Sequence, residues 1–286
     1  MTEPVIVPVA NYHCQVGENP LWNDSDDRIY WADIDTGRLF RADHATGAHE
    51  CFYTGEVVGG FTFQEDDKLL LFEADRIALL DPETGKRRVL KEGIDPDMTR
   101  FNDVIADPEG RVFAGTLGRN DESGGLYRID RDGSVHSLWK GTGCANGMAF
   151  SRNLQKFYWT CSTSRKIYVC DYQRETGALT NRKVFCTVPP EEGTPDGMTI
   201  DAWDEIWTAR WDGRTLLRMT TDGNVVERIE FPVAKISSVT FGGPGLDTLY
   251  VTTAGGSAGS DTADGTLYRL KTRARGRPEY RSRIAV

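Results

Sequence analysis

Short apolar runs separated by polar turns recur six times along the chain. Each repeat has an apolar run, a turn that contains Gly or Asp, a strand-like run rich in aromatic and β-branched residues, and a third run. The repeats start, at spacings of 41 to 50 residues, at Asn19, Gly60, Asn102, Asn146, Asp196 and Ser238. A period in the low forties with several short strands per period is typical of β-propeller blades. The pattern predicts an all-β, six-bladed β-propeller.

Turn residues between the runs support hairpins rather than helices. Asp tolerates turn geometry and Gly supplies the positive φ that many hairpins require. Such turns are expected at Asp35-Thr36-Gly37, Pro108-Glu109-Gly110, Arg131-Asp132-Gly133, Trp211-Asp212-Gly213 and Thr221-Asp222-Gly223. No segment has the sustained i, i+3, i+4, i+7 apolar stripe of an amphipathic helix. The alternative of two β-sandwich domains would need a linker, and none is evident, so one domain is expected over residues 1–286.

The last blade needs a closing strand from another part of the chain. The run Val5-Ile6-Val7-Pro8-Val9 precedes the first repeat and is expected to supply that strand. The tail Arg283-Ile284-Ala285-Val286 is an alternative that would compete for the role or share it.

Composition narrows the function classes. Hydrophobic residues make up 39% and charged residues 27%, as in ordinary globular proteins, and the net charge of −9 argues against a nucleic-acid partner. No apolar run approaches the roughly 20 residues that cross a membrane, and the start of the chain lacks a signal-peptide pattern. Six cysteines without a C-x-x-C pair are expected to be reduced thiols. A cytoplasmic protein that acts on a small molecule is the resulting expectation.

Polar residues stand at the start of the first strand in most repeats. In a propeller these strands line the central channel, so the positions Glu18, Gly59-Gly60, Asn102-Asp103, Asn146, Asp196 and Ser237-Ser238 should meet near the axis. Oxygen groups at one end of buried strands need a partner or an ion. Glu18, Asn146 and Asp196 supply two carboxylates and one amide oxygen, which suit a hard or borderline divalent cation. The alternative is that these residues only form turns at blade entries.

Six short motifs at blade spacing then give the chain a family resemblance. They are G-E-x-P-x-W at 17–22, R-x-N-D at 100–103, D-P-E-G-R-V-F-A-G-T at 107–116, N-G at 146–147, P-D-G-M at 195–198 and F-G-G at 241–243. In this order they resemble the regucalcin (senescence marker protein) and gluconolactonase family of six-bladed propellers. The resemblance extends over essentially the whole chain, to the G-T-L-Y run at 265–268.

The resemblance implies a metal-dependent sugar lactonase, a gluconolactonase-type ester hydrolase that converts an aldonolactone to the aldonic acid. By it, Glu18, Asn146 and Asp196 bind one divalent cation. Arg100 and Asn102 contact the substrate, and Asp196 is the general base. The chemistry is coherent, because a cation can polarise the lactone carbonyl and lower the pKa of a bound water whose proton Asp196 accepts. Arg100 offers a planar fork of donors, and Asn102 can both donate to and accept from a polyol.

Several points stay open at this stage. The metal can be calcium, zinc, magnesium, manganese or ferrous iron, and neither the lactone, its ring size nor the oligomeric state (monomer or small homo-oligomer) is fixed. Asp103 is expected to point away from Asn102 and to be structural, the alternative being a contact with the metal through water. The stretch Thr116–Asn120 lacks the acidic residue that the animal branch of the family has shortly after the matching G-T, so the sugar preference is not transferred.

Three further side chains each have two interpretations. Trp211 would either cover a sugar face at the rim or pack at a blade corner, and Glu73 would either be solvated or reach the substrate. Cys144 stands two residues before Asn146, so it would either lie near the site or be a small buried residue, and we favour the second interpretation.

Two rival functions remain. Related propellers hydrolyse organophosphates or other esters at a similar metal, and a lactone screen with and without chelator separates these. A non-catalytic binding scaffold would be free to carry apolar residues where Glu18, Asn146 and Asp196 stand.

Overall fold

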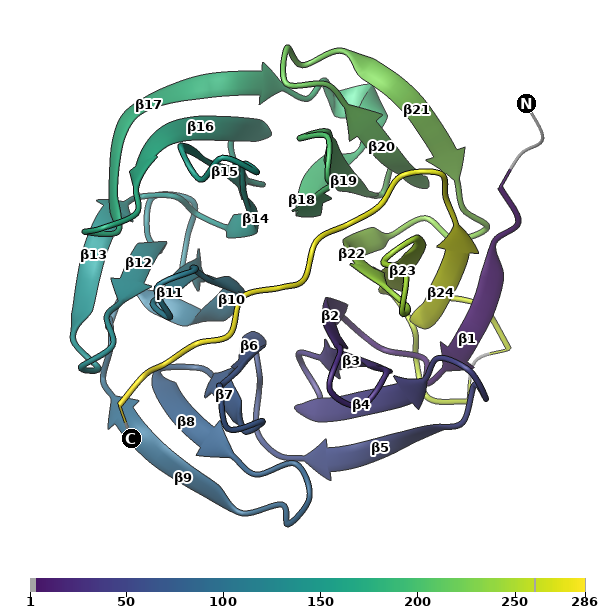
Figure 1. Cartoon of the computed structure of the whole chain (residues 1–286), viewed down its shortest axis with the longest axis horizontal. Helices are drawn as coiled ribbons and strands as arrows, with labels where there is room; N and C mark the ends of the chain where they lie inside the picture. Colours follow the sequence, from purple (N-terminus) through teal and green to yellow (C-terminus); the bar gives the residue numbers. More distant parts are fainter. Residues whose placement is uncertain (1–3, 260, 286) are drawn as a thin grey trace. The chain divides into compact units, whose positions relative to one another are not determined.

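The strands pair into six four-stranded antiparallel sheets, the blades of the predicted six-bladed β-propeller (Figure 1). This computed structural model describes residues 4–259 and 261–285. Within those residues the only helical element is a 3-10 turn at Pro190–Glu192. Each predicted repeat corresponds to one sheet, and its first apolar run forms the first strand of that sheet. The chain divides into two compact units, and the expectation of a single domain stays a prediction.

The first unit contains the residues up to Thr54 together with Val188–Pro278. Its strands are β1 (Val7–Asn11), β2 (Gly17–Asn23), β3 (Arg28–Asp33), β4 (Arg38–Asp43), β5 (His49–Thr54), β18 (Thr194–Ile200), β19 (Ile206–Trp211), β20 (Thr215–Met219), β21 (Val225–Glu230), β22 (Ile236–Gly242), β23 (Thr248–Thr253) and β24 (Thr266–Lys271). They form the sheets β2-β3-β4-β5, β18-β19-β20-β21 and β1-β24-β23-β22. Within this unit the first strands β2 and β18 both pack against β22.

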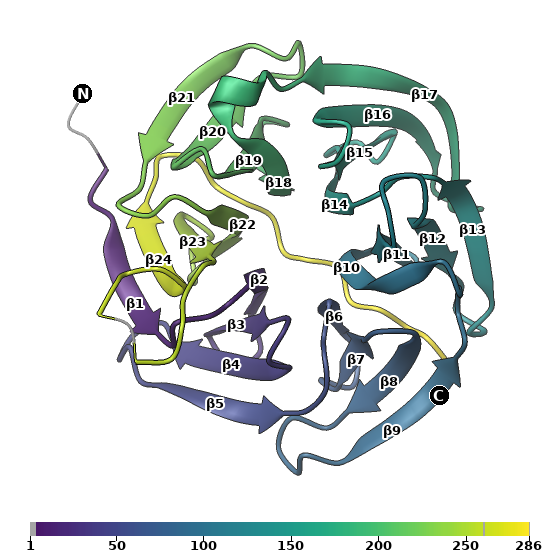
Figure 2. The same ribbon diagram turned by 180° about the vertical axis from the view of Figure 1, so that it is seen from behind.

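The second unit contains Gly55–Thr187 and the residues from Glu279 onward. Its strands are β6 (Gly60–Phe63), β7 (Leu69–Phe72), β8 (Arg76–Leu80), β9 (Arg87–Glu92), β10 (Met98–Ala106), β11 (Val112–Gly118), β12 (Gly125–Ile129), β13 (Val135–Lys140), β14 (Ala145–Phe150), β15 (Lys156–Cys161), β16 (Lys166–Gln173) and β17 (Ala178–Thr187). Each sheet holds four consecutive strands, and within the unit β10 packs against both β6 and β14 (Figure 2).

The closing strand of the last blade comes from the N-terminal side, as predicted. Strand β1 pairs with β24 from Val7 opposite Arg269 to Asn11 opposite Thr266, two residues later than the run proposed from sequence. The tail alternative is wrong for the described residues 283–285. Ser282 instead bridges Gln64 in the second unit, and Arg283 donates its backbone N–H to Gly110 O at 2.8 Å. Val286 lies outside the described residues.

Burial follows strand order within a blade. The first three strands of a blade are largely buried, whereas outer strands such as β5 and β17 contain only exposed and half-buried residues. Second strands carry the largest buried rings, Trp31, Trp159 and Trp207, each 1% exposed or less. Removing a side chain of this size from water stabilises the fold by about 1.5–3 kcal/mol. This explains why the aromatic residues of each repeat concentrate in its second run.

The predicted turns form, with one change of residue. Gly37, Gly110, Gly133 and Gly223 all have positive φ, but in the turn of the fifth blade Asp212, with a φ of 57°, takes the left-handed conformation. Gly213 is needed there for another reason, since a Cβ on it would lie 2.5 Å from Glu192 O.

Candidate functional site

Every predicted site residue lies in the first strand of a blade, where the pairing with the second strand is interrupted. The register shifts at Glu18/Leu21 in β2, Phe101/Val104 in β10, Asn146/Met148 in β14, Pro195/Met198 in β18 and Ile236/Ser238 in β22. Only β6 keeps an unbroken register among the first strands. An irregularity of this kind bends the strand and re-aims the side chains beside it, and it is over-represented next to active sites.

In the first unit, Glu18 and Asp196 place two carboxylates at such breaks. They are 6% and 5% exposed, and Glu18 Oε2 accepts a hydrogen bond of 3.0 Å from the backbone N–H of Asn19. Gly197, which follows Asp196, lets β18 approach β22 closely, because a Cβ there would lie 2.2 Å from Ser238 Oγ. A buried carboxylate is costly without hydrogen bonds or a cation to compensate it. The two carboxylates are also oxygen donors of the kind that a divalent cation takes.

In the second unit, Asn146 supplies an amide at the break in β14. The residue is 5% exposed, its Oδ1 accepts from the backbone N–H of Gly147 at 3.1 Å, and its Nδ2 donates to Ser162 Oγ at 3.3 Å. The bond from the Gly147 N–H fixes which end of the amide is oxygen, because a backbone N–H only donates, whereas a serine hydroxyl can donate or accept. An amide oxygen is a donor of the kind that a hard cation takes.

No group of three or more His, Cys, Asp or Glu side chains is placed to hold a metal within residues 4–259 and 261–285. The ligand set predicted from the sequence is not a group of this kind, because it contains only two carboxylates and its third member is the amide of Asn146.

Strand β10 brings Arg100 and Asn102 into direct contact. Arg100 Nη1 donates to Asn102 Oδ1 at 2.5 Å and to Phe101 O at 3.0 Å. The amide nitrogen of Asn102 donates to Ala145 O at 3.1 Å and lies 3.6 Å from Cys144 Sγ. The two residues predicted to bind substrate are therefore hydrogen-bonded to each other, and Asn102 is also bonded to β14 of the next blade.

Asp103, the next residue, has different neighbours. Its Oδ1 accepts from the backbone N–H of Val104 at 2.8 Å, and it shares no hydrogen-bond partner with Asn102. Burial, and then the negative charge of Glu279, raise the pKa of the Asp103 carboxyl to about 7. These contacts are consistent with the structural role predicted for Asp103. Because its pKa is about 7, the carboxyl changes its charge near neutral pH.

Replacing Asp103 by Asn should change how stability depends on pH. Because the folded-state pKa is raised, the stability due to the neutral acid is fully present below the unfolded pKa of about 4 and is lost as pH rises through about 7. The wild type should lose free energy of unfolding over this window relative to Asp103→Asn, at roughly 1.4 kcal/mol per unit of pKa difference. Urea unfolding at pH 4.5, 6 and 8 measures it, with the exposed Asp222→Asn as control. Parallel curves for wild type and Asp103→Asn would contradict the assignment.

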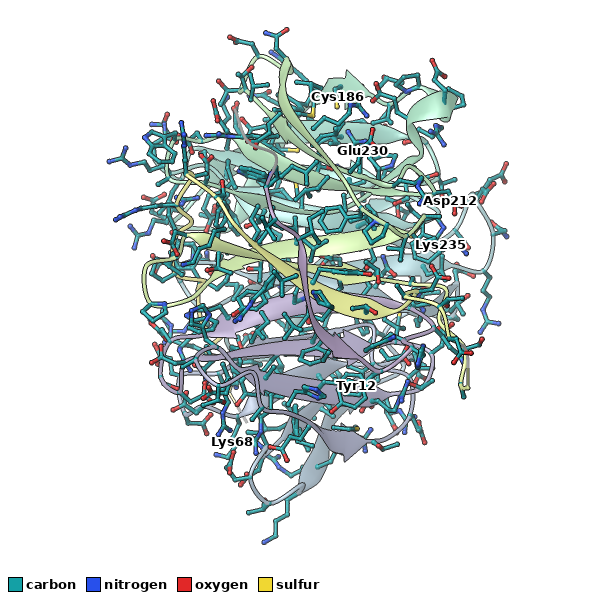
Figure 3. All side chains as sticks on the ribbon, turned by 90° about the vertical axis from the view of Figure 1, so that its right-hand side faces the viewer. Tyr12, Lys68, Cys186, Asp212, Glu230 and Lys235 are labelled. Carbon is teal, nitrogen blue, oxygen red and sulfur yellow. The ribbon has the colours of Figure 1, made fainter. Side chains whose placement is uncertain are left out.

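The remaining candidate residues have identifiable partners. Glu73 is buried and neither solvated nor open to a substrate, because its carboxylate accepts from Arg87 Nε at 2.7 Å. Trp211 is half-buried, with Lys235 Nζ 5.0 Å from its ring centroid. Figure 3 shows Lys235 and Asp212, the neighbour of Trp211, at the same end of the strands of the first unit. A cation–π contact thus adds a third interpretation to the two considered for Trp211.

The stretch after Thr116 is held by hydrogen bonds to residues before β10 and within its own turn. Arg119 donates Nε to Pro96 O at 2.8 Å and its backbone N–H to Asp97 O at 3.1 Å. Asn120 begins a turn closed by its Oδ1 on the backbone N–H of Glu122.

The sequence placed Cys144 close to Asn146 but did not predict its contact with Asn102. The interpretation as a small buried residue is wrong, since the side chain is half-buried and its sulfur lies against the amide of Asn102. Its position two residues before Asn146 was the available signal, but a contact across 42 residues of sequence has no local signature. All six cysteines are free. No helix within the described residues is long and apolar enough to cross a membrane.

Comparison with known proteins agrees with the fold and the motifs. The SMP-30/Gluconolactonase/LRE-like region matches residues 16–255. A pentonolactonase, XacC of Haloferax volcanii, is 44% identical over 98% of this chain and 99% of its own. A 6-deoxy-6-sulfogluconolactonase of Pseudomonas putida is 31% identical, covering 84% and 83% of the two chains.

A solved structure extends the agreement to three dimensions. The calcium-binding protein regucalcin of Agrobacterium tumefaciens superposes with a TM-score of 0.90 at 25% identity, over 99% of this chain and 98% of that one. With the family match across most of the chain and the six blades in place, the chain belongs to the SMP-30/gluconolactonase family of six-bladed β-propellers.

Proposed function

We propose that the protein is a metal-dependent lactonase that hydrolyses a sugar lactone to the aldonic acid, with pentonolactones as its preferred class. The observation that carries this proposal is the match to a pentonolactonase at 44% identity over 98% of the chain. The family match and the identity to a sulfogluconolactonase support the reaction type.

We propose Glu18, Asn146 and Asp196 as the ligands of one divalent cation. Three observations support the set: all are oxygen donors, all are nearly buried, and each stands at a break in register of its own first strand. When bound, such a cation supplies Lewis-acid polarisation of the lactone carbonyl and stabilises the charge that develops on its oxygen. Oxygen donors admit calcium, zinc, magnesium, manganese or ferrous iron.

Asp196 is proposed as the general base. It takes a proton from the attacking water while the water oxygen forms a bond to the lactone carbonyl carbon. The bond between that carbon and the ring oxygen then breaks, and the proton held by Asp196 passes to the ring oxygen, which becomes a hydroxyl. Arg100 donates to the substrate through its guanidinium, and Asn102 holds a substrate hydroxyl. Water is consumed and an open-chain aldonic acid results, so atoms and charges balance.

The setting proposed for this activity is the cytoplasm, with the protein acting as a monomer or small homo-oligomer on a small molecule. The free state of all six cysteines supports a reducing compartment, and the net charge of −9 is unfavourable for nucleic-acid binding.

Removal of the metal should abolish lactone turnover. After dialysis against chelator, initial rates on pentono- and hexonolactones should fall to the spontaneous rate, which must be subtracted, and return when one of the five metals is added. Pentonolactones should be turned over fastest, and aryl ester and organophosphate substrates far more slowly. Full activity at a measured metal content near zero would contradict the proposal. Faster turnover of esters or organophosphates than of lactones would favour the alternative of an organophosphate or ester hydrolase.

A further inference from the structure

The carboxamide of Asn102 has almost all of its hydrogen-bonding capacity engaged by the protein. An asparagine amide has two N–H donors and two acceptor lone pairs on its oxygen. Nδ2 donates to Ala145 O at 3.1 Å and faces Cys144 Sγ at 3.6 Å, while Oδ1 accepts from Arg100 Nη1 at 2.5 Å. Both N–H groups thus meet acceptors, and a single lone pair on Oδ1 is left.

The neighbours also decide which way the amide points. In a flipped amide, Oδ1 would face the carbonyl oxygen of Ala145 and the sulfur of Cys144, and the NH₂ group would face the guanidinium of Arg100. The contacts with Ala145 O and with Arg100 would join acceptor to acceptor and donor to donor, so the flipped state is disfavoured at both ends, whereas the Cys144 thiol can either accept or weakly donate. The observed orientation is therefore a property of the residues around Asn102.

The backbone around Cys144 is held firmly enough to place its sulfur. Its N–H donates to Thr163 Oγ1 at 3.0 Å, its carbonyl accepts from Ser162 N–H at 2.9 Å, and it bridges Leu117 of β11. The close approach of Ala145 is likewise built in, because a Cβ on Gly115 would lie 2.7 Å from Ala145 O. Two acceptors are thus presented side by side to one NH₂ group.

We propose that Cys144 is a positioning residue that, together with Ala145 O, makes Asn102 an acceptor only. Asn102 then holds Arg100 with one lone pair and takes a hydrogen bond donated by a substrate hydroxyl with the other. This inference rests on the proposed lactonase function and narrows its substrate class. The preferred lactone must carry a free hydroxyl that donates at this point, so a lactone whose hydroxyl there is methylated or missing is a poor substrate.

The test compares Cys144→Ala with Cys144→Ser on a parent pentonolactone and its singly O-methylated or deoxy analogues. The measured quantity is the ratio of kcat/KM between the parent and each analogue, because a merely structural role would not move this ratio. In Cys144→Ala one N–H of Asn102 loses its acceptor. That N–H is then free to donate to a substrate oxygen, so Asn102 is no longer an acceptor only. The ratio for the discriminating position should fall about 3- to 10-fold, mainly through KM, as a weak hydrogen bond implies.

The conservative variant and a distant cysteine complete the experiment. Cys144→Ser restores an acceptor and should keep the ratio close to that of the wild type, and Cys186→Ala, another half-buried cysteine, should leave all kinetic constants unchanged. An unchanged ratio in Cys144→Ala, or an equal fall in Cys144→Ser, overturns the inference. If the wild type turns over no lactone at all, the proposed function has failed instead, and the two failures are thereby distinguished.

Discussion

Asp196→Ala should lower lactone turnover by at least about 10³-fold, even at saturating metal. The substitution removes the proposed general base, whose loss typically costs 10²- to 10⁴-fold, and at the same time one of two charged metal ligands. The side chain is 5% exposed and lies where β18 loses register with β19, so no other carboxylate on that strand can take its place. Initial rates, corrected for spontaneous ring opening, measure the effect, and metal content is determined on the same samples.

Asp196→Asn separates the two roles of this carboxylate. It keeps the shape and an oxygen donor, so it should retain part of the metal affinity while losing most of the turnover. Asp222→Asn, in an exposed turn of the same blade, controls for a general loss of negative charge and should behave as wild type. Unchanged turnover in Asp196→Ala at full metal occupancy would refute the catalytic assignment.

The blades were predictable because their determinants are local. Each repeat carries its own apolar run, turn and aromatic second run, and each of these segments forms its strand without reference to distant residues. The candidate site residues also follow from local sequence, since each lies in the first strand of a blade. Family motifs then added roles that the pattern of residue types alone leaves open.

What the sequence could not predict are contacts between distant segments and the breaks in register. The bond from Asn102 to Ala145 O and the ion pair of Glu73 with Arg87 join residues 43 and 14 positions apart, and neither has a sequence pattern. The tail was a plausible closing strand because its composition is apolar. Pairing with β24 is nevertheless made by Val7–Asn11, while Ile284 donates its backbone N–H to Gln64 Oε1 in the second unit.

Gly59→Ala should be the most damaging small substitution in the second unit. Gly59 directly precedes β6, and a Cβ built on it would lie 1.9 Å from Phe101 O and 2.3 Å from the carbonyl carbon of Phe101. Both atoms belong to backbone, which cannot turn aside as a flexible side chain would. Both sides are also fixed, because Gly59 N–H donates to Phe72 O at 2.7 Å and Phe101 N–H to Glu73 O at 2.9 Å.

Relief of that overlap requires β10 to move by more than an ångström, and β10 carries Arg100 and Asn102. Overpacking in a well-packed core costs typically 1–3 kcal/mol, and a clash between two anchored backbones should exceed that range. We expect a loss of at least about 3 kcal/mol, which lowers Tm by roughly 6–12 °C in a protein of this size or prevents folding altogether. Thermal unfolding followed by circular dichroism measures the shift.

Gly245→Ala is the matched control. The Cβ built on Gly245 meets nothing closer than 3.5 Å, the residue is exposed, and its φ is not positive. The free energy of unfolding of Gly245→Ala should therefore lie within about 0.5 kcal/mol of the wild-type value. A Gly59→Ala protein that melts within 2 °C of the wild type would show that β6 and β10 do not approach as closely as described. Should the variant fold with a lower Tm, the displaced β10 gives a second signature. The hydrogen bond of Asn102 to Ala145 O would then lengthen, and kcat/KM should fall further than the loss of stability alone can explain.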